Sequence, residues 1–197
     1  MASHSRYIIF FKPYGVLSQF TRREGYLSLA DFGPFPGDVY PVGRLDADSE
    51  GLLLLTNDNA VKWRMTDPRF GHPRTYLVQV ERLPGEETLK RLRTGVPIGD
   101  NLTRQAVVRV LESDPNLPPR PVPIRFRKTV PTFWLEITLR EGRNRQVRKM
   151  TAAIGHPTVR LVRTHLGVLS LEGLLPGQSR SLLDGEIAEL KQELGGK

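Results

Sequence analysis

The sequence contains no cysteine and only four histidines among its 197 residues. The absence of cysteine excludes disulfides, thiolate zinc sites, iron–sulfur clusters and a cysteine nucleophile, and it is typical of proteins from a reducing compartment. Four scattered histidines leave little from which to build a metal cage. We therefore expect no metal site in this protein.

Long hydrophobic runs are also missing. The apolar run near the N-terminus, Tyr7 to Phe11, ends at Lys12 and Pro13 and is too short for a signal peptide. The longest later run, Leu52 to Leu55, is far shorter than a membrane span. We expect a soluble cytoplasmic protein with no membrane partner.

What the sequence has instead is positive charge gathered in one window. Lysine and arginine number 29 against 21 aspartates and glutamates, which gives a formal net charge of +8. Between Arg120 and Arg163 there are eleven basic and two acidic side chains, so this window carries +9 and the rest of the chain −1. A uniformly solvated basic surface would not concentrate its charge in this way. The window predicts a polyanionic partner, above all a nucleic acid.

Short strands alternate with short helices along the chain, and no segment repeats at a fixed period. The proline-rich segment Asp114–Pro123 is expected to be an irregular loop. With 39% hydrophobic and 25% charged residues, the chain has the composition of an ordinary folded protein. Its many short strands and few helices predict an α+β fold, with a mixed, mostly antiparallel central sheet and flanking helices. Apolar patterning predicts strands at 7–11, 52–56, 76–80, 105–112, 133–139, 158–163 and 168–171. Helices are predicted at 59–65, 86–94, 145–154 and 184–190, with Asp58 and Asn144 as N-caps of the first and third.

The segment GRLDADSEGLLLLTND, residues 43–58, places carboxylates directly before the apolar run Leu52–Leu55. Asp46 and Asp48 suggest a calcium loop, but the position that would need the closing glutamate is Asn57. The ordinary interpretation of an isolated Asp46 is a turn former or helix cap. Here the neighbouring Arg44 and the buried strand that follows favour a carboxylate held rigidly at the rim of a cleft.

A second segment, residues 137–167, places arginines around the start of an amphipathic helix. A strand ends at Arg140, a Glu-Gly turn follows, and Val147 and Met150 give the helix an apolar face. The ordinary interpretation of the run GRNRQVRK is a solvated basic surface. Because the apolar face must pack, however, the arginines are held in place, and the helix start can collect phosphates or a carboxylate.

Five motifs stand in order along the chain. They are Lys12-Pro13-Tyr14-Gly15, Gly43-Arg44-Leu45-Asp46 followed by SEGLLLLTND, the Arg74-Thr75-Tyr76 strand, EGRNRQVRKM at 141–150 and GHPTVRLVRTHLG at 155–167. Together they resemble the pseudouridine synthases of the RsuA type, from about Tyr7 to about Leu183. Within that family, residues 123–158 resemble the members that act on large-subunit ribosomal RNA. The resemblance implies the pseudouridine synthase fold with its active-site cleft, and ribosomal RNA as partner.

The resemblance also implies roles for individual residues. Asp46 matches the family's catalytic aspartate, Tyr76 the tyrosine that stacks on the target base, and Arg148 the arginine that pairs with the aspartate. Leu161 matches the apolar residue under the base. One departure is an arginine two positions before the tyrosine, where many members have lysine. The other residues expected to bind substrate are Arg44, Arg74, Arg143, Arg145, Lys12, Arg125, Arg127 and Lys128.

We expect residues 1–197 to form a single catalytic domain, with two subdomains of about 1–70 and 71–197 that share one sheet. Many relatives carry an RNA-binding S4 domain at the N-terminus. Only six residues precede Tyr7 here, so no S4 domain is expected and the affinity for RNA must come from the catalytic domain itself. We expect a monomer.

The residue chemistry agrees with the resemblance. Isomerising uridine breaks the N1–C1′ bond, turns the base and joins C5 to C1′. A carboxylate near C1′ can stabilise the sugar cation, attack it or remove its 2′ proton. The target uridine must leave its stack, so an aromatic and an apolar side chain are expected around it. No cofactor and no metal are required.

Two alternatives belong to other functional classes. A non-catalytic basic RNA-binding or ribosome-assembly protein would use the same charged window, and Asp46 would be dispensable. A metal-dependent nuclease built on Asp46 and Asp48 would lose activity in the presence of a chelator.

Overall fold

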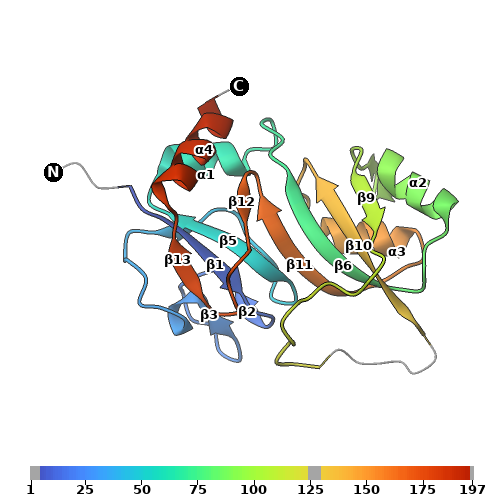
Figure 1. Cartoon of the computed structure of the whole chain (residues 1–197), viewed down its shortest axis with the longest axis horizontal. Coiled ribbons are helices and arrows are strands. Elements are labelled where there is room, and N and C mark those ends of the chain that lie inside the picture. The colour runs from blue at the N-terminus through green and yellow to red at the C-terminus, as the bar shows by residue number, and fades with distance from the viewer. Residues whose placement is uncertain (1–4, 124–129, 196–197) are drawn as a thin grey trace.

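The structure is a computed structural model that describes residues 5–123 and 130–195 (Figure 1). The strands are β1 (Tyr7–Lys12), β2 (Val16–Leu17), β3 (Leu27–Ser28), β4 (Tyr40–Pro41), β5 (Glu50–Thr56), β6 (Arg74–Glu81), β7 (Pro97–Ile98), β8 (Asn101–Leu102), β9 (Val107–Val110), β10 (Thr132–Leu139), β11 (Thr158–Leu166), β12 (Leu169–Ser170) and β13 (Ser179–Ser181). The helices are α1 (Asn59–Thr66), α2 (Glu86–Thr94), α3 (Gln146–Ala153) and α4 (Asp184–Gly195), with a 3-10 turn at Leu29–Asp31.

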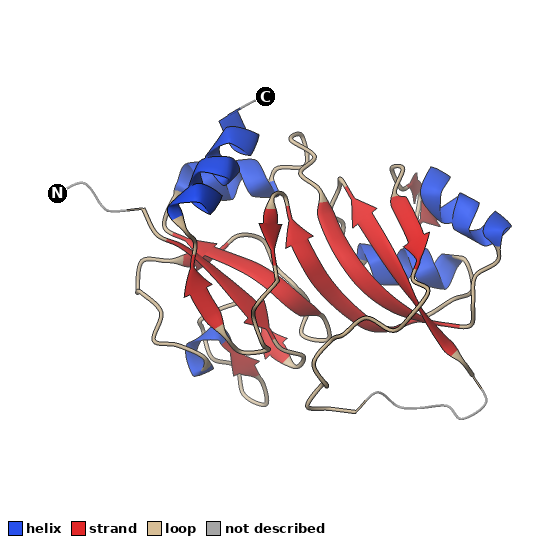
Figure 2. Ribbon diagram, in the orientation of Figure 1, coloured by secondary structure: helices blue, strands red, loops and turns tan. Residues whose placement is uncertain are grey.

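One nine-stranded sheet organises the molecule. It follows the path β13-β1-β5-β11-β6-β10-β9, with β4 beside β5 and β12 beside β11. Within this sheet every strand pair in the described ranges is antiparallel except β5 with β11. Figure 2 shows α1 and α4 together at one end of the sheet and α2 and α3 at the other. The α+β class and the mixed, mostly antiparallel sheet are confirmed.

The apolar run that precedes the first helix forms the buried strand β5. All seven of its residues are buried. Leu52 and Leu54 belong to one core cluster and Leu53 and Leu55 to another, so both faces of the strand are covered. Gly51 has a φ of +110°, and a Cβ there would lie 2.2 Å from a backbone oxygen of β11. Glycine therefore lets β5 and β11 approach side by side.

Strand β11 joins the two halves of the sheet, since it pairs with β5 on one side and β6 on the other. The chain then returns to the first half. Strand β13 pairs with β1, and Leu190 and Leu194 of α4 pack in one cluster with Tyr7 and Ile9. The first half of the sheet is therefore built from both ends of the sequence, which differs from the expected division near residue 70.

Two helix starts test the predicted caps. Asp58 caps α1 as predicted, because its carboxylate accepts from the backbone N–H groups of Ala60 and Val61. The prediction of Asn144 as cap of α3 is wrong. The capping position is Arg145, in left-handed backbone with φ 54° and ψ 34°, and the helix begins at Gln146.

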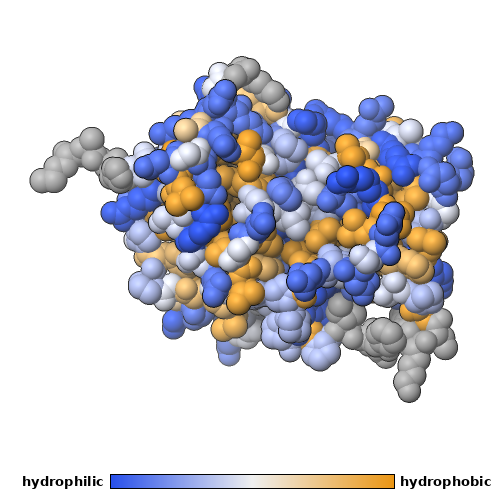
Figure 3. All heavy atoms as spheres, in the orientation of Figure 1, coloured by the Kyte–Doolittle hydropathy of each residue, from blue (hydrophilic) through white to orange (hydrophobic). Residues whose placement is uncertain are grey.

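The remaining boundaries differ by a few residues from the predicted ones. Strand β9 is shorter than the predicted strand at 105–112, and α4 extends past the predicted end at residue 190. Residues 114–123 contain no helix or strand, as predicted. On the face shown in Figure 3, hydrophobic residues lie among hydrophilic ones. Over the described part of the chain, no helix has the length and apolar character needed to cross a membrane.

Candidate active site

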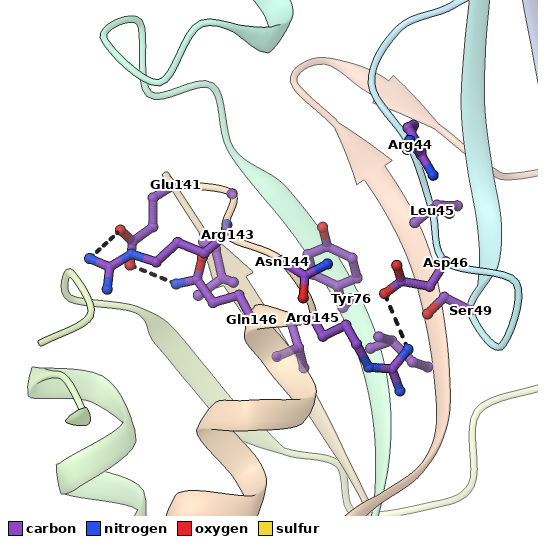
Figure 4. A pocket seen from close by; sticks show the side chains of 14 residues that line it. Arg44, Leu45, Asp46, Ser49, Tyr76, Glu141, Arg143, Asn144, Arg145 and Gln146 are labelled. Carbon is purple, nitrogen blue, oxygen red and sulfur yellow. Dashed lines mark hydrogen bonds and ion pairs between the residues drawn. The ribbon is translucent and has the colours of Figure 1, made fainter. Parts of the chain in front are cut away.

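A cavity of about 340 Å³ lies between the loop before β5, strands β6 and β11, and the turn that leads into α3 (Figure 4). Asp46 enters it from the loop, Tyr76 from β6 and Leu161 from β11. Tyr76 is half-buried and Leu161 is buried. Three residues from separate parts of the sequence therefore line one cavity, which combines a carboxylate, an aromatic ring and an aliphatic side chain.

The loop that carries Asp46 is held by the N-terminal motif. The buried Ser18 hydroxyl accepts from the Leu45 backbone N–H at 3.0 Å and donates to the Leu45 carbonyl at 2.8 Å. The Gly15 N–H donates to the carbonyl of Ala47 at 2.7 Å. Both residues beside Asp46 are therefore tied to residues 15–18, the segment that follows β1, which fixes the position of the loop that carries the carboxylate.

The structure corrects the expectation that Lys12 binds substrate. Its side chain is fully buried, and the ammonium donates to the carbonyls of Pro13 at 2.9 Å and Val16 at 2.7 Å. Burial lowers the pKa of Lys12 to about 7, although nearby carboxylates, Glu50 foremost, favour its charged form. Lys12 therefore orders the turn that holds the Asp46 loop and does not face the cavity.

The expected pairing of Arg148 with Asp46 is also corrected. Arg145 lies 3.6 Å from the Asp46 carboxylate and donates to both oxygens of Asp48, at 3.0 and 2.7 Å. Arg148 lies 3.4 Å from the Asp48 carboxylate and donates to the carbonyls of Asp48 and Thr158. Arg145, at the capping position before α3, therefore lies beside Asp46, whereas Arg148, in the first turn of α3, contacts Asp48.

The charges of these groups respond to one another. Burial alone would raise the pKa of Asp48, but the hydrogen bonds from Arg145 and the charges of Arg148 and Arg145 outweigh it and hold the pKa below its ordinary value. Burial lowers the pKa of Arg148, and the charge of Asp48 opposes this. Asp48 is thus an ionised anchor for two arginines and not a second catalytic carboxylate.

The turn before α3 is organised by two side chains that the sequence did not single out. The Gln146 amide oxygen accepts from the Arg143 N–H at 2.9 Å, and its nitrogen donates to Glu141 at 2.6 Å. Glu141 also accepts from the Arg104 N–H and lies 3.2 Å from the Arg143 guanidinium. Buried Gln146 and Glu141 therefore shape the wall of the cavity. They lie within the recognised motif but have no catalytic pattern of their own.

The other residues expected at the site are distributed as follows. Arg44, Arg143 and Arg145 line the cavity with Asp46. Arg74 lines a neighbouring cavity, where its guanidinium donates to the Met65 carbonyl at 3.0 Å. Arg125, Arg127 and Lys128 lie outside the described residues. No group of three or more His, Asp or Glu side chains in the described ranges is placed to hold a metal ion.

The arrangement suits a flat ring held between aromatic and aliphatic surfaces. Tyr76 offers a π face and Leu161 an apolar surface. Asp46 lies at the edge of the cavity, with Arg145 beside its carboxylate. A carboxylate in this position can stabilise, attack or deprotonate a sugar attached to the bound ring.

Comparisons with known proteins agree with this geometry. Residues 6–153 match the model of a family described as RNA pseudouridylate synthase. The chain is 57% identical over 167 residues to the ribosomal large subunit pseudouridine synthase E of Xanthomonas axonopodis pv. citri (strain 306), covering 84% of this chain and 87% of that protein. It is 53% identical over 175 residues to the protein of the same name from Vibrio vulnificus (strain CMCP6), covering 89% and 74%.

More distant proteins extend the comparison. The chain is 35% identical over 186 residues to ribosomal large subunit pseudouridine synthase B of Bacillus subtilis (strain 168), covering 94% of this chain and 71% of that protein. A crystal structure of a pseudouridylate synthase matches with a TM-score of 0.79 at 28% identity, over 95% of this chain and 74% of that one.

Proposed function

The chain belongs to the RNA pseudouridylate synthase family, whose members isomerise uridine to pseudouridine, and we propose that its own substrate is large-subunit ribosomal RNA. Relatives named for that substrate share 51% to 57% of their residues with it over 84% to 89% of its length. This identity supports a shared substrate class. We further propose that the protein acts in the cytoplasm, on the ribosome or its precursors, and as a monomer.

The meeting of Asp46, Tyr76 and Leu161 in one cavity is the observation that carries the proposed site. Asp46 is the catalytic carboxylate and acts at C1′ of the target uridine. The base leaves its stack and lies between the Tyr76 ring and Leu161, so that it can turn without escaping. Arg145 orients the Asp46 carboxylate, because it lies 3.6 Å away and is itself fixed by two hydrogen bonds to Asp48.

The rest of the chain supplies RNA affinity. Arg44, Arg143 and Arg145 line the cavity. The basic segment with Arg125, Arg127 and Lys128 lies, like Arg143 and Arg145, in the sequence window that carries +9. We propose that Arg44, Arg125, Arg127 and Lys128 contact phosphates and that the protein works as one catalytic domain. The continuous sheet through β5, β11 and β6 supports a single domain, because the cavity draws residues from both of its halves.

Pseudouridine mapping tests this proposal. Ribosomal RNA from cells that lack the gene should have lost one or a few pseudouridines in the large subunit. The wild-type gene should restore them, Asp46→Asn should not, and Asp100→Asn, at an exposed turn between β7 and β8, should restore them fully. Unchanged large-subunit RNA in the deletion, or full restoration by Asp46→Asn, would overturn the assignment.

A further inference from the structure

A second cavity, of about 230 Å³, adjoins the first. Tyr76, Arg44, Gly142 and Arg143 line both. The Tyr76 hydroxyl points away from Arg145 (Figure 4), and Tyr76 lines both cavities. A nucleotide stacked on Tyr76 in the first cavity would therefore have this second space beside it.

Three guanidinium groups give the second cavity its charge. Arg44, Arg74 and Arg163 line it together with the aliphatic part of Arg143, and none of its lining residues is acidic. Among the described residues, no carboxylate lies within 4.0 Å of Arg44, Arg74 or Arg163. Several arginines elsewhere in the fold are paired with carboxylates, for example Arg160 with Glu50 and Arg180 with Glu186. We call this space the arginine cavity.

Arg143 contributes its chain but not its charge to the arginine cavity. Its guanidinium donates to the carbonyls of Asn101 and Leu102 and lies 3.2 Å from Glu141, on the far side of the turn before α3. Arg74 lies against the backbone at Gly142, where a Cβ would be 3.3 Å from its Nη1. The glycine thus leaves the room in which the Arg74 guanidinium is placed.

Arg163 is the unusual member. It is only 3% exposed, its Nε donates to the Leu52 carbonyl at 2.8 Å, and its Nη2 is buried with no hydrogen-bond partner in the described chain. Arg163 is paired with Tyr76 of β6, and the register of β11 is irregular between Arg163 and His165. Burial lowers the pKa of Arg163, with Tyr76 opposing that shift and Arg74 adding to it.

Burying a cation with an unsatisfied N–H donor is unfavourable, because the hydrogen bonds to water are lost, unless another acceptor or an anion replaces the water. The elements packed around Arg163 bring the Tyr76 side chain but no carboxylate to the arginine cavity. An anion from outside the protein would supply the acceptor that the buried Nη2 lacks. A phosphate diester fits the donor set, because its two charged oxygens accept the parallel bonds that guanidinium groups offer.

We propose that the arginine cavity binds one backbone phosphate of the substrate RNA, next to the target uridine, with Arg163 donating from the floor and Arg74 and Arg44 from the sides. The proposal rests on the proposed function, because the phosphate belongs to the RNA strand whose base lies against Tyr76. Phosphate contacts position a nucleic acid without reading its sequence. Holding this phosphate would anchor the strand on the far side of the ring while the freed base turns.

Neutralising single phosphates tests the proposal. A short RNA taken from the mapped target would be prepared with one uncharged methylphosphonate linkage at each position around the uridine, and its dissociation constant measured. For wild-type protein we expect one linkage near the uridine to weaken binding about tenfold or more. The same linkage should have no further effect in Arg163→Gln, and a reduced effect in Arg74→Gln. Arg180→Gln, on β13 and paired with Glu186, is the matched control and should behave as wild type.

Each result decides the question. If every linkage weakens wild type and Arg163→Gln equally, the arginine cavity does not hold a strand phosphate. If inorganic phosphate raises the melting temperature of wild type but not of Arg163→Gln, and no linkage matters, the site takes the free ion and the proposal is overturned. Should Arg163→Gln not fold, the linkage scan with wild type and Arg74→Gln still decides. Failure of the proposed function is distinguishable, because the mapping experiment would then yield no target.

Discussion

The Arg145 guanidinium lies 3.6 Å from the Asp46 carboxylate, with 41% and 39% of the two side chains exposed. The same guanidinium makes two hydrogen bonds to Asp48, so its orientation is set before substrate arrives. Arg148 reaches Asp48 and two backbone carbonyls instead. The two arginines therefore have separable roles: one orients the catalytic carboxylate and the other secures the loop.

The first prediction separates these roles. Arg145→Met should lower the rate at saturating RNA about 10- to 100-fold, because the carboxylate loses its oriented partner, and should change the melting temperature little. Arg148→Met should lower the melting temperature as well, since it removes hydrogen bonds to two carbonyls at partly buried positions. Single-turnover kinetics and thermal unfolding measure the two effects.

Arg145→Lys serves as the control for charge. It should recover part of the rate, because the charge returns without the planar fork. Loss of turnover in Arg148→Met at an unchanged melting temperature, with Arg145→Met near normal, would instead place Arg148 at the reacting carboxylate.

The second prediction concerns Tyr76. Tyr76→Ala should weaken RNA binding by about 1 to 3 kcal/mol and slow the reaction, because base stacking on the ring is lost. Tyr76→Phe should bind normally but turn over slowly, if the hydroxyl takes part in proton transfer after the base has turned. Tyr40→Ala, at an exposed ring outside the cavity, is the control. Fluorescence anisotropy and single-turnover rates are the measurements, and normal turnover by Tyr76→Phe limits Tyr76 to stacking.

The third prediction uses the buried lysine. The pKa of Lys12 is about 7 in the fold against 10.5 ordinarily, so between these pH values the unfolded chain binds more protons than the folded one. Folding stability should therefore rise with pH in this interval, by at most about 1.4 kcal/mol per pH unit from this group, and be flat below it. A neutral amine still donates to both carbonyls, so the turn survives deprotonation.

Urea unfolding of wild type and Lys12→Met from pH 6 to pH 9.5 tests the sign. The variant is less stable throughout, because the carbonyls of Pro13 and Val16 lose their donor. The stability difference in favour of wild type should widen as the pH rises above about 7. A difference independent of pH would show that Lys12 stays charged in the fold.

The fourth prediction concerns Ser18. Ser18→Ala leaves the Leu45 N–H and carbonyl without their partner, which should cost about 1 to 3 kcal/mol of stability. The loosened loop displaces Asp46, so the rate at saturating RNA should fall while RNA affinity is retained. Ser170→Ala, at an exposed hydrogen bond on β12, is the control. Weakened affinity at a normal rate would contradict the positioning role.

Local features of the fold could be predicted from the sequence because they depend on neighbouring residues. The continuous apolar run Leu52–Leu55 predicts a strand covered on both faces, and Asp58 predicts the start of α1. The Arg145 to Asp48 contact could not be predicted in this way, because it joins residues 97 positions apart and depends on where α3 begins. The residue at that start, Arg145, has left-handed backbone, which the sequence pattern does not predict.

The candidate site shows the same limit. The motifs singled out Asp46, Tyr76 and Leu161, and the fold brings these residues to one cavity. Ser18 lies outside the five motifs, and Arg163 lies within the fifth motif but has no assigned role there. Their importance comes from burial and from partners far along the chain. Ser18 contacts Leu45, 27 positions away in the loop before β5, and Arg163 contacts Leu52 of β5, 111 positions back.

The position of β11 has a consequence for the order in which the protein acquires activity. This strand lies between β5 and β6, supplies Leu161 and closes the gap between the two halves, although it is synthesised after most of the chain. Pairings between residues so far apart form slowly, since the entropy of closing long loops must be overcome first. Neither cavity can exist on a growing chain before β11 has emerged and paired. We therefore expect the nascent protein to have no catalytic activity until the last third of the chain, which contains β11, has been synthesised.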